Sequence, residues 1–289
     1  MMLRLSLAFA ILVFARLAAQ PATAETLAEL AQQTHYHGIV VARSGTATLL
    51  LASHDGLFAL DKDGTATQVS PTQDFMGFSP DPAAATSYYA SGHPASGGNS
   101  GFLRSADGGG TWKQLSPGTD GPVDFHQMDV SPADPKTIYG SYGQIQVSRD
   151  GGSTWSIAGN APSGLIAIAA SSVNAERVYA ATENGLYASE DGGASWTPVS
   201  FKGEVVSTVE VGPNKIVYAF VLGQGLMKAV EDDIGNWQPL SNEFGEAIPL
   251  HLAVDGKDDQ HLALTTQSND VLESLDGGKS WRPFGKSAE

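Results

Sequence analysis

Five of the seven histidines fall in segments whose other residues could join them in binding an ion. Three segments carry an aromatic residue between two donor-bearing neighbours: His35-Tyr36-His37, Asp74-Phe75-Met76 and Asp124-Phe125-His126. Residues two apart share one face of an extended strand, so the outer members of each triplet point the same way. His54 and His93 occupy matching positions in two turns further along the chain. Imidazole with carboxylate and thioether neighbours is a donor set for transition metals.

We predict that four histidines bind a transition metal directly: His37, His54, His93 and His126. His35, Asp74 and Asp124 are expected to orient these imidazoles or to act as further ligands, and Met76 is a candidate thioether ligand. Histidine together with methionine in an oxidising compartment favours copper, whereas histidine with aspartate alone would suit zinc, nickel or iron equally. The chain has no cysteine, which excludes thiolate ligands and disulfides.

The other two histidines are assigned structural or surface roles. His251 falls one position out of phase with His37 and His126, so it is expected to point into its sheet. His261 does not align with either set of candidate residues.

An internal repeat must position these residues. A segment that starts with Ser, contains Asp-Gly-Gly and ends with Trp occurs at 105–112, 148–155, 189–196 and 274–281, and a decayed copy ends at Trp237. The five tryptophans of the chain lie 43, 41, 41 and 44 positions apart. Asp-Gly-Gly suits a hairpin turn, because the carboxylate can bond its own backbone and glycine tolerates positive φ. A period of this length is typical of a four-stranded propeller blade.

The repeated pattern resembles the Asp-box, or BNR repeat, of β-propellers. That group includes sialidase-like glycosyl hydrolases, sortilin-like receptors and a photosystem assembly factor. The resemblance implies an all-β fold in which the boxes are structural turns remote from any active site. Aligning the units predicts a single six-bladed β-propeller over residues 35–286. Seven blades is the alternative, if the short N-terminal segment 25–34, which has a helical pattern, conceals a partial blade.

The propeller geometry places the candidate residues together. In each blade, the start of the innermost strand and the turn between the second and third strands lie on the same face of the propeller. The eight candidate residues are therefore expected around one mouth of the central channel. The matching triplets of the later units, at 164–166, 205–207 and 248–250, are mostly apolar, so the polar residues gather on three neighbouring blades.

Two other classes of function are open beside a binding protein for a metal ion or small ligand. A sialidase-like hydrolase needs arginines to clamp a substrate carboxylate, and the five arginines after residue 24 are expected away from the histidines. A general glycosidase needs two carboxylates, for which Asp74 and Asp124 are the candidates. A non-enzymatic scaffold for a periplasmic protein partner would expose an aromatic patch, but most tyrosines align with one another and are expected in the core.

Residues 1–24 have the pattern of a secretory signal. Arg4 precedes an apolar stretch from Leu5 to Phe14, and Ala22-Thr23-Ala24 is a small-residue cleavage site. We therefore expect a periplasmic or secreted protein, monomeric and without a membrane span. Without Arg4 and Arg16 the chain has 14 basic and 31 acidic residues, a formal charge near −17, which disfavours nucleic acid and anionic membranes as partners. No nucleotide or flavin motif is present.

Overall fold

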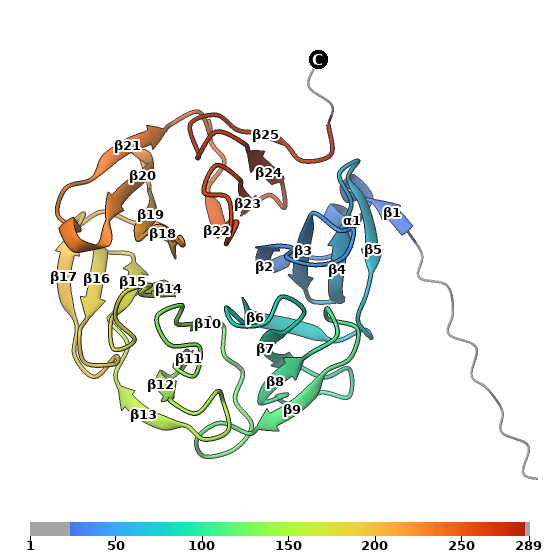
Figure 1. Ribbon diagram of the computed structural model, residues 1–289, viewed down its shortest axis with the longest axis horizontal. Coiled ribbons are helices and arrows are strands. Elements are labelled where there is room, and N and C mark those ends of the chain that lie inside the picture. The colour runs from blue at the N-terminus through green and yellow to red at the C-terminus, as the bar shows by residue number, and fades with distance from the viewer. Residues whose placement is uncertain (1–23, 287–289) are drawn as a thin grey trace, which may run out of the picture.

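The computed structural model describes residues 24–286, which form six antiparallel sheets arranged in a ring around a central axis (Figure 1). The predicted six-bladed β-propeller is confirmed, and the seven-bladed alternative is wrong. Each blade runs outward in chain order from an inner strand to an outer strand. The predicted signal segment lies outside the described residues except for Ala24. None of the helices in the described part is long and apolar enough to cross a bilayer.

The strands of the first three blades are β2 (Tyr36–Val41), β3 (Leu49–Ser53), β4 (Gly56–Leu60) and β5 (Thr65–Gln68); β6 (Asp74–Pro80), β7 (Tyr88–His93), β8 (Phe102–Ser105) and β9 (Lys113–Ser116); and β10 (Gln127–Val130), β11 (Ile138–Tyr142), β12 (Gln144–Ser148) and β13 (Ser156–Gly159). Those of the last three are β14 (Leu165–Ala170), β15 (Val178–Thr182), β16 (Gly185–Ser189) and β17 (Thr197–Ser200); β18 (Val206–Val211), β19 (Ile216–Val221), β20 (Gly225–Val230) and β21 (Gln238–Ser241); and β22 (Pro249–Val254), β23 (Leu262–Thr266), β24 (Val271–Ser274) and β25 (Arg282–Pro283). A 3₁₀ turn, Glu231–Asp233, stands where the decayed repeat was recognised.

The N-terminal segment closes the seam between the first and last blades. Strand β1 (Ala24–Thr26) pairs antiparallel with β5 and gives blade 1 a fifth, outermost strand. The expected helix is present as α1 (Leu27–Gln33), and Thr26 and Glu29 form a capping box at its start. Leu30 is buried in a cluster that includes residues of blade 1 and of blade 6. The segment is therefore part of the first blade and not a separate one.

The Asp-Gly-Gly turns are structural. In blade 3, Asp150 accepts hydrogen bonds from the Ser148 hydroxyl at 2.9 Å and from the Thr154 amide and hydroxyl at 2.9 and 2.6 Å. The same set recurs around Asp107, Asp191 and Asp276. The bond from the Thr154 hydroxyl is the main cause that lowers the pKa of Asp150 to about 2. These carboxylates are fully used in holding their own turns.

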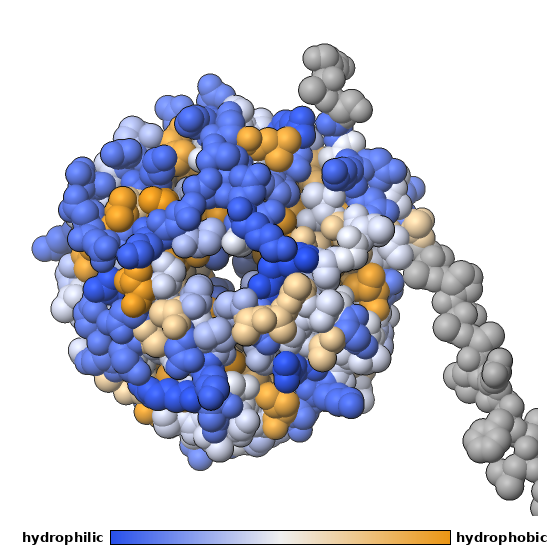
Figure 2. Space-filling model, viewed as in Figure 1, coloured by the Kyte–Doolittle hydropathy of each residue, from blue (hydrophilic) through white to orange (hydrophobic). Residues whose placement is uncertain are grey.

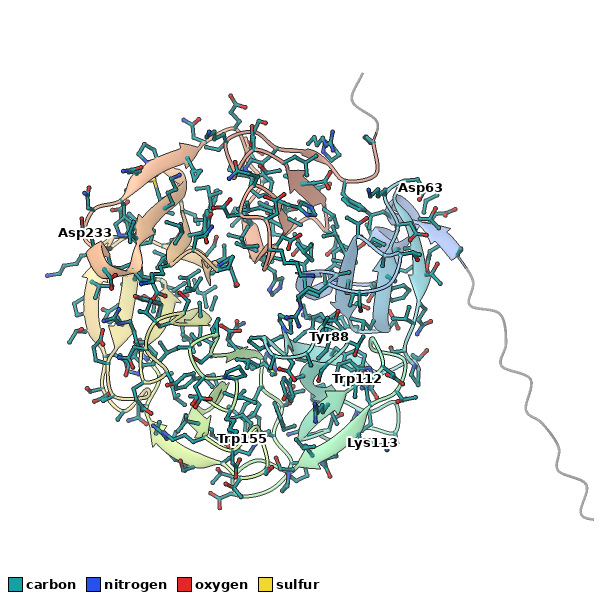
Figure 3. The ribbon with its side chains drawn as sticks, viewed as in Figure 1. Asp63, Tyr88, Trp112, Lys113, Trp155 and Asp233 are labelled. Atoms are coloured by element: carbon teal, nitrogen blue, oxygen red, sulfur yellow. The ribbon has the colours of Figure 1, made fainter. Side chains whose placement is uncertain are left out.

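The same turns connect neighbouring blades. Gly152 has φ of +88°, and a Cβ placed there would lie 2.0 Å from Cε1 of Phe102 in the preceding blade. Trp155 packs against Phe102 and Phe125, with ring centroids 5.0 and 4.8 Å apart. Trp155 lies in the outer part of its blade, away from the channel (Figure 3). Local turn chemistry and packing between blades thus depend on the same eight residues of each repeat.

Candidate metal site at one mouth of the channel

A backbone irregularity occurs at the start of five inner strands, and in blades 1 and 2 the inserted residue lines the channel. Strands β2, β6, β14, β18 and β22 each shift register by one residue near their start. The extra residues are His37 in blade 1 and Met76 in blade 2. In blade 3 the matching residue, His126, stands directly before β10. A bulge of this kind re-aims the side chain of the inserted residue. All three residues line a central cavity of about 510 Å³, whose opening is seen in Figure 2.

His251 also lines this cavity, so its expected orientation into the sheet is wrong. The bulge in β22 lies between Pro249 and His251. Strict alternation of faces fails at a bulge, because two residues on one strand oppose a single residue on the other. Burial lowers the pKa of His251 to about 4. His261 lies at the opposite end of blade 6, where its Nε2 is 3.2 Å from Oε1 of Glu273, and this fits the structural role expected.

The first compact group joins His37, His54 and Asp74. The Nε2 atoms of His37 and His54 are 3.0 Å apart, and the two rings meet edge to face. Nδ1 of His54 is 3.1 Å from Oδ2 of Asp74 on the next blade. One possible ligand atom from each residue lies within 4.8 Å of the other two. Burial, followed by the neighbouring His54, lowers the pKa of His37 to about 4, while Asp74 acts in the opposite direction.

The second group joins His93, Asp124 and His126. Oδ2 of Asp124 is 3.1 Å from Nε2 of His93 and 2.8 Å from Nε2 of His126. The other ring nitrogen of His93, Nδ1, is 3.0 Å from the carbonyl oxygen of Gly98 in the same loop. The Asp124 residue is only 4% exposed, and its Oδ1 is buried without a hydrogen-bond partner. Oδ1 of Asp74 is buried and unpartnered in the same way.

The four predicted histidine ligands therefore lie at one mouth but form two groups. His35 lies beside the first group, 6.2 Å from His54 between ring centroids, and its Nδ1 is 3.3 Å from the Asn269 side chain. Met76 lines the central cavity, as His37 and His126 do.

The five arginines of the described chain are committed elsewhere, as expected. Arg43 donates to backbone carbonyls of residues 81 and 84 at the other end of the channel. The other four pair with carboxylates away from the histidines: Arg104 with Asp81, Arg149 with Glu176, Arg177 with Glu190 and Arg282 with Glu273.

Sequence reasoning missed two carboxylates inside the channel, Asp129 and Glu210. Asp129 accepts hydrogen bonds from the Ser79 hydroxyl at 2.9 Å and the Ala170 amide at 2.8 Å, and burial raises its pKa to about 6. Burial, and then the charge of Asp129, raise the pKa of Glu210 well above its ordinary value. Both residues pair with a tyrosine that recurs at the same position of the second strand in each repeat unit concerned, Asp129 with Tyr139 and Glu210 with Tyr218. Alignment on those tyrosines would have revealed them.

Comparison with known proteins supports the class of fold. The fold and its polar channel are those of a six-bladed β-propeller. No model of a protein family matches the sequence, and neither does any curated protein. The GH74 xyloglucanase from Xanthomonas campestris superposes with a TM-score of 0.60 at 20% identity over 91% of this chain and 47% of that chain. The GH74 enzyme from Niastella koreensis has a TM-score of 0.60 at 17% identity, covering 86% of this chain and 45% of that one. YCF48 bound to D1 peptide has a TM-score of 0.55 at 17% identity, covering 93% and 88%.

This chain thus spans less than half the length of the GH74 structures it resembles. At these identities the likeness establishes the fold alone.

Proposed function

We propose that this protein is an exported propeller that binds a transition-metal ion through His37 and His54, with copper the favoured ion and zinc the next. The observation that carries the proposal is the 3.0 Å separation of the two Nε2 atoms. Metal–nitrogen bonds are about 2.0–2.1 Å long, so neighbouring ligands of one ion are roughly 2.9 Å apart in a square-planar shell and roughly 3.3 Å apart in a tetrahedral one. The two nitrogens already have the spacing of ligands that share an ion.

Asp74 supplies the orientation that such a ligand needs. The ionised carboxylate of Asp74 accepts a hydrogen bond from Nδ1–H of His54, which leaves the lone pair of His54 on Nε2, facing His37. Histidine ligands of metals commonly donate their second N–H to a carboxylate in this way. The low pKa of His37 keeps that imidazole neutral in mildly acidic solution, as metal binding requires.

Copper is favoured by the chemistry of the mouth and by the expected compartment. Nitrogen and oxygen donors in a tetragonal arrangement suit Cu(II), and the signal-like segment 1–24 supports an oxidising location, periplasmic or secreted.

The glycosyl hydrolase alternative has less support from the geometry. Asp74 and Asp124, the candidate acid and base, both face imidazole nitrogens at 3.1 Å or closer. The described arginines lie away from this mouth, so a clamp for an anionic sugar is missing there. Docking of a protein segment is the second candidate, because Tyr142 is 47% exposed beside the His93 loop, where its hydroxyl accepts a hydrogen bond from Asn99.

Calorimetric titration of tag-free protein with Cu(II) and Zn(II) tests the proposal. We expect a dissociation constant below about 1 μM for Cu(II), and loss of this binding in a His37→Ala/His54→Ala variant. His261→Ala, which removes a histidine far from the mouth, is the matched control and should bind as the unmodified protein does. Binding weaker than about 1 mM, or binding that survives the double substitution, would refute the metal site. Turnover of chromogenic glycosides that disappears in Asp74→Asn would replace it with the hydrolase.

A further inference from the structure

The seam at which the last blade meets the first (Figure 1) contains a cavity of about 570 Å³, and we propose that this cavity binds a small aromatic carboxylate. Its walls include the turn at 41–48 in blade 1 and residues 255–284 of blade 6. This turn joins β2 to β3 at the end of the blade away from His37, so the cavity is separate from the histidine mouth. The volume is within the roughly 300–1,000 Å³ of most small-molecule sites.

A tyrosine that fills four of the other junctions between blades is missing at the seam. Ala263 stands opposite Ala253 in blade 6, as Tyr218 stands opposite Glu210 in blade 5. The same place in the second strand is taken in blades 2 to 5 by tyrosines that are at most 5% exposed: Tyr89, Tyr139, Tyr179 and Tyr218. Each of these rings lies in a cluster with residues of the following blade. At the seam a methyl group stands in place of the ring.

The first blade does not compensate for the missing ring. Tyr218 lies in a cluster with three leucines of blade 6, Leu252, Leu262 and Leu264. The matching residues of blade 1, which share a cluster with Ala263, are Ile39, Leu49 and Leu51. These side chains are no larger than the three leucines, so they do not take up the room that the tyrosine ring fills at the preceding junction.

A carboxylate that is only 9% exposed stands beside the alanine. Glu273 on β24 is the cross-strand partner of Ala263. Nη2 of Arg282 donates to Oε2 of Glu273 at 3.0 Å, and Nε2 of His261 is 3.2 Å from Oε1. Nδ1 of the same histidine is 3.7 Å from Oδ2 of Asp255. Both carboxylates of the cavity wall are therefore faced by groups that can carry a positive charge, so they do not require a cationic ligand.

The remaining hydrogen-bond donors of the wall suit an anion. Lys62 lines the cavity and forms no ion pair with a carboxylate of the described chain. The side chain of Arg282 is still 44% exposed, and the hydroxyl oxygen of Thr48 is buried in the wall without a hydrogen-bond partner. Lysine and arginine form charge-assisted hydrogen bonds with carboxylates. The carboxylate of the ligand is therefore assigned to the side of the cavity that holds Lys62 and Arg282.

The rest of the wall includes apolar side chains. Val41 of blade 1 and Phe284 of blade 6 are buried and line the cavity, and the exposed Leu275 lines it too. Aromatic rings pack favourably against one another in offset or edge-to-face arrangements, so Phe284 offers a partner to a ring that takes the place of the missing tyrosine. A ring that carries a carboxylate uses both the apolar and the cationic parts of the wall.

Calorimetric titration of tag-free, metal-free protein with benzoate tests the inference, and benzyl alcohol serves as a probe with the same ring and no charge. We expect a dissociation constant below about 1 mM for benzoate and at least about tenfold weaker binding of benzyl alcohol. Ala263→Tyr, which restores the residue of blades 2 to 5, should abolish binding. His37→Ala/His54→Ala should leave it unchanged, so the result does not depend on the proposed metal site.

A pair of lysine substitutions provides a second test that does not alter the core. Lys62→Ala should weaken benzoate binding about 3–10-fold, because it removes a charge from the wall of the cavity. Lys136→Ala, which removes an exposed lysine of blade 3, is the matched control and should bind benzoate as the unmodified protein does.

The possible failures point to different conclusions. Benzoate binding weaker than about 1 mM in the unmodified protein overturns the inference and leaves the metal site untouched. Benzyl alcohol that binds as tightly as benzoate overturns the role of the cationic groups. Full binding by folded Ala263→Tyr overturns the location in the seam. If Ala263→Tyr does not fold, the lysine pair decides the location, and equal affinities of Lys62→Ala and Lys136→Ala overturn it.

Discussion

Replacement of Asp74 by asparagine tests the site most sharply, because it changes one atom and should act only through His54. In the native protein the carboxylate holds a proton on Nδ1 of His54 at 3.1 Å, so the lone pair of Nε2 accepts a hydrogen bond from Nε2 of His37 at 3.0 Å or binds an ion. An asparagine amide can donate to Nδ1 instead, which moves the ring proton to Nε2 and blocks the nitrogen that faces His37. Asp74→Asn should therefore weaken Cu(II) binding while leaving both imidazoles in place.

The expected magnitude follows from the exposure of the pair. Loss of a group that orients a metal ligand costs about 10–100-fold in affinity, or about 1.4–2.7 kcal/mol. The His54 side chain is 46% exposed, so water can replace part of the lost hydrogen bond, and we expect the lower end, about 10–30-fold. The loss should be read from competition titrations with a chromophoric chelator.

Asp61→Asn is the matched control, since Asp61 is an exposed aspartate in a turn of blade 1. Urea unfolding of metal-free Asp61→Asn should be within about 0.5 kcal/mol of the unmodified protein, as for most surface changes. The same measurement on metal-free Asp74→Asn, whose side chain is 17% exposed, separates any loss of stability from the loss of affinity. An affinity for Cu(II) within twofold of the unmodified protein in Asp74→Asn would refute the orienting role. An equal loss in Asp61→Asn would show that overall charge, and not the tautomer of His54, controls binding.

The remaining predictions concern stability. Gly152→Ala should lower the free energy of unfolding by about 2–5 kcal/mol, because it combines a left-handed backbone with a clash against Phe102. Gly151→Ala, where a Cβ meets nothing within 4 Å, should lower it by only about 1–2 kcal/mol. Equal losses for the two variants in urea unfolding would show that the contact between blades is unimportant. Burial lowers the pKa of His251 to about 4, so between pH 6.5 and 4 the unfolded chain binds a proton that the folded protein does not, and stability due to this group is full above pH 6.5 and lost as the pH falls. The difference in unfolding free energy between the unmodified protein and His251→Gln should shrink by no more than about 3 kcal/mol across that window. The difference between the two proteins is measured because the channel carboxylates Asp129 and Glu210, whose pKa values are raised, change stability with pH in the opposite direction in both proteins. Parallel curves of unfolding free energy against pH for the two proteins would contradict the prediction.

Much of the architecture follows from the sequence because the signals are local and repeated. The Asp-Gly-Gly turns need only a carboxylate, a following hydroxyl and glycines with positive φ, all within eight residues. Repetition at a constant period then predicts six blades and the order of their strands, and the structure excludes the seventh blade that the sequence left open. It also shows which residues share a face, since the turn between the second and third strands returns to the start of the first. This was enough to bring His37, His54, His93 and His126 to one mouth.

The tertiary structure alone decided how those residues are grouped. The bulges at the start of the inner strands break the two-residue alternation, and for that reason His251 faces the channel against expectation. The contacts of His54 with Asp74 and of His93 with Asp124 cross from one blade to the next, and their distances depend on how neighbouring sheets are packed and rotated. The same packing buries Asp129 and Glu210 within the channel and raises their pKa values. Such effects arise between units that are distant in sequence, where no local pattern encodes the separation of two atoms.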